Sequence, residues 1–149
     1  MEKKRANLIG LASDHAGYEM KEALIKWLKE SDIQVIDFGC SSSESCDYPD
    51  FAHPLARSVA DGACVFGISL CGSGNGINMV VNKYPGIRSA LCWNEEISKL
   101  ARAHNNANIC ALPARFISIE EAKTIVKIFL ETPFDGGRHL RRINKIPVQ

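Results

Sequence analysis

The sequence predicts an α/β protein with a doubly wound, Rossmann-like fold, a three-layer sandwich in which a five-stranded parallel sheet carries helices on both faces. Two observations predict this fold class. Short apolar runs alternate with segments of helical periodicity along the whole chain, as expected when parallel strands are joined by right-handed crossover helices. With 149 residues, 46% of them hydrophobic and 23% charged, the chain has the size and composition of one globular domain. We therefore expect a single domain over residues 1–149.

The first half of the chain contains three predicted strands and two predicted helices. The strands are expected at residues 7–13, 34–39 and 63–70. The third strand is the most apolar and is expected at the centre of the sheet, because buried parallel strands lose their polar alternation. The first helix has an apolar stripe formed by Met20, Ala23, Leu24, Trp27 and Leu28. Pro49 and Asp50 are typical of a helix start, and this second helix is expected to run to about Ala60.

The second half of the chain continues the alternation. Two more strands are expected, at residues 87–92 and 108–112. A short helix before them runs to about Asn82, and Asn94 is placed to cap the next helix. The apolar stripe of that helix comprises Ile97, Leu100, Ala101 and His104. Ser118 and Glu121 form a capping box for a further helix. Its stripe comprises Ala122, Ile125, Ile128 and Phe129. Glycines then break this helix, and a basic helical tail begins at about residue 137.

The overall charge and the cysteines narrow the classes of function. The net charge of +1 provides no general attraction for nucleic acid or for an acidic membrane. No apolar run is long enough to cross a membrane, and the basic start of the chain is followed by too few apolar residues for a signal peptide, so we predict a cytoplasmic protein. The cysteines have neither a CxxC pair nor the spacing of a zinc site, and we expect free thiols and no metal. They are Cys40, Cys46, Cys64, Cys71, Cys92 and Cys110.

Five loops of the predicted fold lie where ligands of doubly wound proteins bind, beyond the carboxyl ends of the strands. They are residues 13–17, 39–50, 71–76, 92–94 and 113–116. In the third loop Cys71 ends a strand, and the stretch "CGSGNG" follows the strand directly. A dinucleotide-binding GxGxxG pattern fails here, because its third glycine would fall on Ile77 or on Met79. A Walker loop is disfavoured because no Lys-Ser or Lys-Thr pair follows the glycines. A cysteine phosphatase is disfavoured because the loop lacks the arginine that would bind the phosphate.

What remains is a loop whose backbone N–H groups can surround an oxyanion. Cys71 at its edge is placed for proton abstraction next to a carbonyl, since a thiol has an ordinary pKa of about 8.5 that a helix N-terminus can lower. The loop amides would then stabilise the resulting enediolate. A purely structural role, in which Cys71 ends the strand as a small apolar residue, fits this spacing equally well.

Further polar residues lie near the same loops or in the tail. Asp14 and His15 follow the first strand, where Asp14 suits a helix cap and His15 suits a phosphate donor. His104 lies on an apolar stripe, which is more typical of a core or interface residue than of a catalyst. His53 and His139 have no distinguishing context, and we interpret both as structural. The tail carries a basic face formed by Arg138, Arg141, Arg142 and Lys145. If the tail folds over the strand ends, Arg138 and Arg142 would clamp a phosphate.

Five motifs in register along essentially the whole chain resemble those of the type B ribose-5-phosphate isomerases. They are "SDHAGYEMK", "DYPDFA", "CGSGNGI", "ARAHNNANI" and "GGRHLRRI". The resemblance implies a sugar-phosphate isomerase that interconverts ribose 5-phosphate and ribulose 5-phosphate by ring opening and a cis-enediolate, without metal or other cofactor. It also implies a homodimer or homotetramer whose active sites are shared between subunits.

The resemblance assigns roles to individual residues. Cys71 would move the proton between C1 and C2 with help from Ser73, and His104 would open the furanose ring. The anion hole would be formed by Gly72, Gly74, Asn75 and Gly76. Sugar hydroxyls would contact Asp14, Tyr48 and Asn105. The phosphate would bind His15, Arg115, Arg138 and Arg142.

Some relatives lack the loop cysteine and use a glutamate six residues later. This chain has Cys71 and, at that later position, Ile77, so it resembles the branch that depends on the thiol. Isomerases of allose or galactose 6-phosphate, a non-catalytic sugar-phosphate-binding module and a nicotinamide oxidoreductase are the alternatives.

Overall fold

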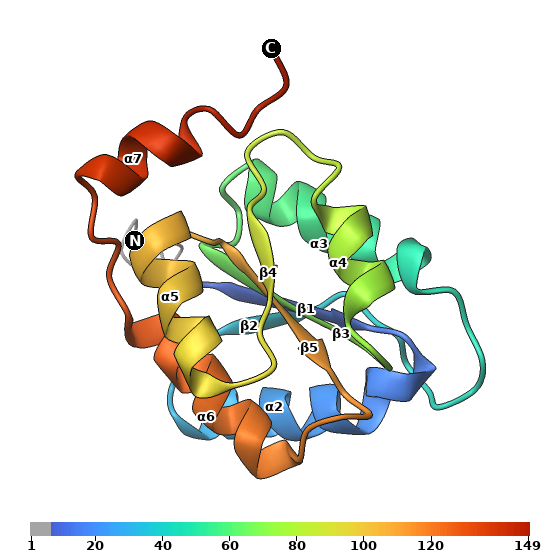
Figure 1. Cartoon of the computed structure of the whole chain (residues 1–149). Helices are drawn as coiled ribbons and strands as arrows, with labels where there is room; N and C mark the ends of the chain where they lie inside the picture. The colour runs from blue at the N-terminus through green and yellow to red at the C-terminus, as the bar shows by residue number, and fades with distance from the viewer. Residues whose placement is uncertain (1–6) are drawn as a thin grey trace.

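An all-parallel sheet lies at the centre of the computed structural model, which describes residues 7–149 (Figure 1). Within these residues the sheet has five strands in the order β2-β1-β3-β5-β4. The strands are β1 (Ile9–Ser13), β2 (Val35–Asp37), β3 (Phe66–Cys71), β4 (Ser89–Leu91) and β5 (Ile109–Pro113). The predicted fold class, the five strands and the central place of β3 are confirmed. Most of the basic start of the chain, from which we predict no export signal, lies outside the described residues.

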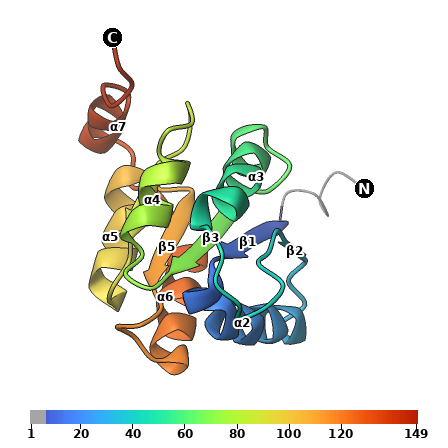
Figure 2. The same cartoon turned by 90° about the vertical axis from the view of Figure 1, so that its right-hand side faces the viewer.

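The helices cover both faces of this sheet (Figure 2). Their bounds are η1 (His15–Gly17), α2 (Tyr18–Glu30), α3 (Tyr48–Ala60), α4 (Asn75–Val81), α5 (Glu95–Asn105), α6 (Ile119–Glu131) and α7 (Arg138–Ile143). Helices α2, α5 and α6 bury one core cluster against the sheet, and α3 and α4 bury the other. Asn94 caps α5, and Ser118 with Glu121 forms the predicted capping box of α6. None of the helices formed by residues 7–149 is long and apolar enough to cross a membrane.

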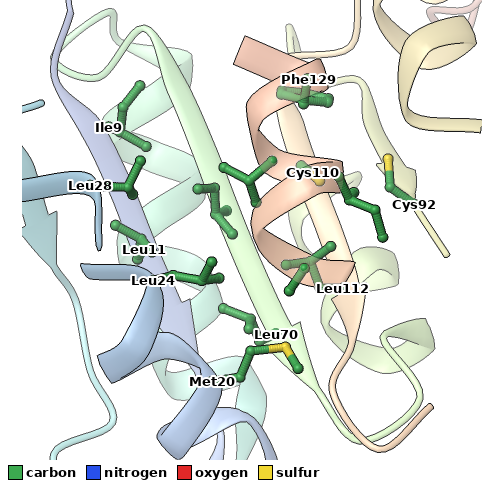
Figure 3. Close-up of a cluster of buried hydrophobic side chains, with 14 of the residues drawn as sticks. Ile9, Leu11, Met20, Leu24, Leu28, Leu70, Cys92, Cys110, Leu112 and Phe129 are labelled. Atoms are coloured by element: carbon green, nitrogen blue, oxygen red, sulfur yellow. The ribbon is translucent and has the colours of Figure 1, made fainter. Parts of the chain in front are cut away.

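The larger core cluster fills the layer between the sheet and helices α2 and α6 (Figure 3). Leu11 of β1 and Leu70 of β3 meet Leu24 of α2, and Phe129 of α6 packs beside Cys110 of β5. All of these side chains are fully buried. At roughly 1.5–3 kcal/mol for each large apolar side chain taken out of water, this layer stabilises the sheet whose carboxyl edge carries the candidate loops.

The predicted apolar stripe of α5 is partly wrong. The face turned to the core carries Ser98, Ala101 and Arg102, whereas Leu100 is 37% exposed. Ser98 donates a hydrogen bond of 2.8 Å to a backbone oxygen of α6. The guanidinium of Arg102 lies 4.7 Å from the Phe66 ring centroid and donates to a backbone oxygen at 2.7 Å. Polar side chains can thus occupy the buried face of α5 because residues distant in sequence accept their hydrogen bonds. Hydrophobic periodicity does not reveal these partners.

An ion pair joins a buried lysine of α2 to a partly exposed aspartate of β2. The ammonium of Lys21 is fully buried and donates to both carboxylate oxygens of Asp37, at 2.9 and 3.0 Å, and to Glu22 at 2.9 Å. Burial by itself would lower the pKa of Lys21, but its hydrogen bonds to the carboxylates of Asp37 and Glu22, with their negative charges, outweigh it and raise this pKa above its ordinary value. Asp37 also accepts from the backbone N–H of Gly39 at 2.9 Å. The pair therefore anchors the start of the loop that leads to α3.

We expect Asp37→Asn to lower the free energy of unfolding by about 1–3 kcal/mol, because the Asp37 carboxylate accepts two hydrogen bonds from the buried Lys21 ammonium, although its own side chain is 40% exposed and Glu22 still pairs with Lys21. Glu22→Gln is the matched control: Glu22 accepts one hydrogen bond from Lys21 where Asp37 accepts two, and its replacement is expected to cost under about 1 kcal/mol. Urea unfolding of both variants at one protein concentration measures the difference. Equal losses for the two variants would contradict a special role for the Lys21–Asp37 pair.

Candidate active site

The carboxyl edge of the sheet brings together the first group of predicted site residues. We call this group the thiol half-site; it comprises Asp14, His15, Tyr48, residues 71–76 and Arg115. Cys71 ends β3, and the backbone N–H of Asp14 donates to the oxygen of Leu70 on the same strand at 3.2 Å. The backbone N–H of Arg115, beyond β5, donates to the oxygen of Gly72 at 3.0 Å. Three parallel strands thus place these residues side by side.

Close packing explains the glycines of the loop. A Cβ atom on Gly76 would lie 2.5 Å from the Tyr48 ring, and one on Gly72 would lie 3.2 Å from a guanidinium nitrogen of Arg115. Gly74 has a φ of 77°, in the left-handed region that favours glycine. The loop backbone is therefore in close contact with two predicted ligand-binding side chains, and the glycines are required for that contact.

The polar side chains of the loop are more accessible than the thiol. Cys71 is only 5% exposed and packs in the core cluster on the α3 and α4 side of the sheet. Ser73 and Asn75 are exposed, and Ser73 Oγ accepts a hydrogen bond of 3.2 Å from the Asn75 backbone N–H. The thiol thus lies beneath a loop whose hydroxyl and amide groups face outward.

Asp14 and His15 are held in defined orientations. Asp14 Oδ1 accepts from the backbone N–H groups of Ala16 and Gly17 at 2.9 and 3.2 Å, so the predicted capping role is confirmed. His15 Nδ1 accepts from the backbone N–H of Cys46 at 3.2 Å. In a neutral ring the proton is then on Nε2, which leaves Nε2–H free to donate to a ligand. The loop before α3 thereby sets the tautomer of His15.

The second group of predicted residues lies at the opposite edge of the sheet. We call it the imidazole half-site; it comprises His104, Asn105, Arg138, His139 and Arg142. His104 and Asn105 end α5, which leads into the amino end of β5. Helix α7 packs at this end of α5, away from the loop that follows β3 (Figures 1 and 2). The tail therefore does not fold over the carboxyl ends of the strands of its own chain, and Arg138 and Arg142 stay exposed.

His139 belongs to this half-site and was interpreted from the sequence as structural. Its ring stacks on that of His104, with centroids 4.2 Å apart and planes 11° apart. Burial, together with the charges of His104 and Arg138, lowers the pKa of His139 from its ordinary value. The sequence feature that could have identified His139 as a site residue is its position in "GGRHLRRI", between two predicted phosphate ligands on a single helical segment. His53, the other histidine interpreted as structural, hydrogen-bonds the hydroxyl of Tyr84.

Comparisons with known proteins place the whole described fold in one family. A family model described as Ribose/Galactose Isomerase matches residues 9–146. The chain is 39% identical over 138 residues to ribose-5-phosphate isomerase B of Escherichia coli, with 93% of each protein covered. It is 46% identical over 137 residues to ribose-5-phosphate isomerase B of Mycobacterium leprae, covering 90% of this chain and 84% of that protein.

Solved structures are similar over the same length. A ribose 5-phosphate isomerase from Thermotoga maritima is 51% identical with a TM-score of 0.92, covering 93% of this chain and 96% of that one. Ribose-5-phosphate isomerase B from Mycoplasma genitalium with bound ribulose-5-phosphate is 41% identical with a TM-score of 0.90, and 93% of each chain is covered.

Proposed function

Because the chain belongs to the ribose/galactose isomerase family, we propose that it interconverts ribose 5-phosphate and ribulose 5-phosphate. The observation that carries the mechanism is the thiol half-site, in which Cys71 lies under a loop of backbone amides and beside Asp14. A sugar phosphate has the groups that such a site can bind. Its acidic C–H lies next to a carbonyl whose oxygen gains negative charge during the reaction, and it also carries hydroxyls and a dianionic phosphate.

In this mechanism the Cys71 thiolate removes the proton from C2 of the open-chain aldose. The electron pair of that bond forms the C1–C2 double bond of a cis-enediolate. The backbone N–H groups of Gly72, Gly74 and Gly76, with the exposed side-chain amide of Asn75, stabilise the negative oxygen. The exposed Ser73 hydroxyl assists the proton transfer between the two oxygens. Return of the proton from Cys71 to C1 completes the ketose. Asp14, through Oδ2, and Tyr48 hold sugar hydroxyls.

His104 would open the furanose ring before this proton transfer, with Asn105 holding a hydroxyl. Within one chain it lies at the other edge of the sheet from Cys71, so we propose that a second copy supplies it. The edge strand β4 is flanked by exposed apolar side chains, among them Met79 at 65% and Trp93 at 53%, which another copy can cover. We propose a homodimer, or a homotetramer built from such dimers, with each site assembled from the thiol half-site of one copy and the imidazole half-site of the next.

The phosphate would bind between the two half-sites. His15 Nε2–H and Arg115 donate from the thiol half-site, and Arg138 and Arg142 donate from the imidazole half-site of the second copy. We propose that residues 1–149 act as one isomerase domain with a basic helical tail. The cytoplasmic location stays a prediction.

The reaction is tested by mixing the protein with ribose 5-phosphate and measuring ketose formation without added cofactor. Allose 6-phosphate and galactose 6-phosphate, assayed in parallel, test the six-carbon alternatives. We expect the highest kcat/KM for ribose 5-phosphate. Binding of ribose 5-phosphate without ketose formation would instead support a non-catalytic sugar-phosphate-binding module.

Arg142→Ala is expected to raise KM for ribose 5-phosphate with little change in kcat, because a contact to the non-reacting phosphate stabilises substrate and transition state alike. One charge-assisted hydrogen bond contributes about 1.5–3 kcal/mol, or roughly 10- to 150-fold in kcat/KM. Arg141→Ala is the matched control, since Arg141 is the neighbouring exposed arginine of α7 and has no proposed contact. Steady-state kinetics of both variants measure the effect, and an unchanged KM for Arg142→Ala would place Arg142 outside the site.

A further inference from the structure

His104, Asp135 and His139 form a cluster with the composition of a metal site, and we propose that it binds a divalent transition-metal ion such as Zn²⁺, which inhibits the isomerase. Each residue offers one ligand atom, and these atoms all lie within 4.8 Å of one another. Among residues 7–149 this is the one group of histidine, cysteine or acidic side chains that converges in this way. We call it the His-Asp-His cluster.

Tertiary structure assembles the cluster from three separate segments. His104 is in the last turn of α5, His139 is in the first turn of α7, and Asp135 lies in the segment that joins α6 to α7. The backbone N–H of Asp135 donates to the oxygen of Ala103 at 2.9 Å, which fixes that segment against α5. Stacking of the two imidazole rings at 4.2 Å fixes α7 against the same helix. The three side chains are thus near one another without a metal. The planes of the stacked rings are only 11° apart, so one imidazole must turn out of the stack before both rings can direct a nitrogen lone pair at one ion.

The ligand set selects the class of ion. Two imidazole nitrogens and one carboxylate oxygen are typical of zinc and of similar first-row ions, whereas Mg²⁺ and Ca²⁺ prefer oxygen ligands alone. Ligands of tetrahedral zinc lie about 2.0–2.2 Å from the ion and so roughly 3.4 Å from one another. Closing the remaining gap requires rotation of the exposed Asp135 side chain and of one of the two stacked imidazoles. Three protein ligands leave the fourth position open to water.

Neighbouring charges limit the affinity. Arg138 and Arg142 lie on the same helix as His139 and repel a cation, while Asp135 attracts it. We therefore expect weak binding that a chelator reverses, in contrast to the tight binding of a structural zinc site that stabilises a fold.

Inhibition rests on the proposed function, because it requires that His104 act on the sugar ring. A metal ion bound to the imidazole of His104 occupies the lone pair that would accept a proton during ring opening. It also blocks the approach of the sugar to the imidazole half-site. Zn²⁺ should therefore reduce the activity on ribose 5-phosphate, and EDTA should restore it.

Calorimetric titration of the metal-free full-length protein with Zn²⁺, without substrate, tests the site directly. We expect one ion bound per chain at the cluster. Asp135→Asn should weaken binding at least about tenfold, since even indirect partners of metal ligands contribute 10- to 100-fold to affinity. The concentration of Zn²⁺ that halves the activity should rise by a similar factor, relative to the metal-free activity of each variant. Asp61→Asn, at an exposed carboxylate after α3, is the matched control and should leave both values unchanged.

A titration of Cys71→Ser separates this site from metal capture by the thiol. Zn²⁺ binding that is lost in Cys71→Ser and unchanged in both Asp135→Asn and His139→Gln would overturn the proposal, as would the absence of any binding. Retained Zn²⁺ binding in a protein that forms no ketose would support the cluster and contradict only the proposed isomerase function.

Discussion

Replacement of Cys71 by alanine is expected to reduce kcat for ribose 5-phosphate by about 10²–10⁴-fold, the range that a positioned acid–base group contributes. The physical reason is that the loop amides stabilise charge on oxygen but cannot accept the proton from C2. Asp14 is near the loop, but its carboxylate is already engaged as a helix cap through Oδ1. Exchange of the C2 proton with deuterated solvent should fall in parallel with kcat.

Substrate binding should survive this replacement, because the proposed phosphate ligands are His15 and three arginines, and Cys71 is not among them. Calorimetric titration with ribose 5-phosphate tests this point. Cys46→Ala is the matched control: Cys46 is a partly exposed cysteine at the same edge of the sheet, 4.0 Å from His15 Nδ1, and has no proposed role in proton transfer. Full activity of Cys71→Ala, or an equal loss in Cys46→Ala, would remove Cys71 from the mechanism and favour its structural interpretation.

The second large effect is the recovery of activity when two inactive variants are combined. We expect co-expressed Cys71→Ala and His104→Ala chains to be active although each variant alone is nearly inactive. A hybrid dimer contains one site with both replacements and one site with neither, because Cys71 and His104 of one chain belong to different sites. If half of the dimers are hybrids with one intact site each, activity returns to about a quarter of that of the unmodified protein.

Co-expression of Cys71→Ala with Ser73→Ala is the control for this experiment. Both residues lie in the thiol half-site of the same chain, so every site of a hybrid dimer retains one of the two replacements. This pair should recover no activity beyond the mean of the two variants assayed alone. Differently tagged chains allow the hybrid to be isolated by two affinity steps before assay. Equal activity of the two hybrids would mean that each site is built from a single chain.

Much of the fold and of the thiol half-site could be predicted from the sequence, because the interactions that determine them are local. The caps of α5 and α6 depend on residues three positions apart. The strands follow from apolar runs, and the topology of parallel sheets places the loops that follow β1, β3 and β5 at one edge. The glycines after Cys71 predicted a tight loop, which the structure contains. Roles in catalysis and binding stay predictions until the variants are measured.

The rest depends on partners distant in sequence. Lys21 can be fully buried because Asp37 of β2 pairs with it. The Arg102 side chain points into the core because backbone oxygens accept its hydrogen bonds and the Phe66 ring packs against its guanidinium. Neither pairing leaves a signal in the periodicity of α2 or α5. The stack of His139 on His104 likewise exists only once α7 packs against α5.

By itself the sequence determined the order of strands and helices, the thiol beside a glycine-rich loop and the basic composition of the tail, since each is a property of a few consecutive residues. Tertiary structure decided which faces are buried and at which edge of the sheet each group lies. It separates the thiol from the imidazole within one chain because α5 runs antiparallel to the strands it joins, so the end of that helix lies at the edge where strands begin. That separation is the physical basis for our proposal that a second copy completes each site.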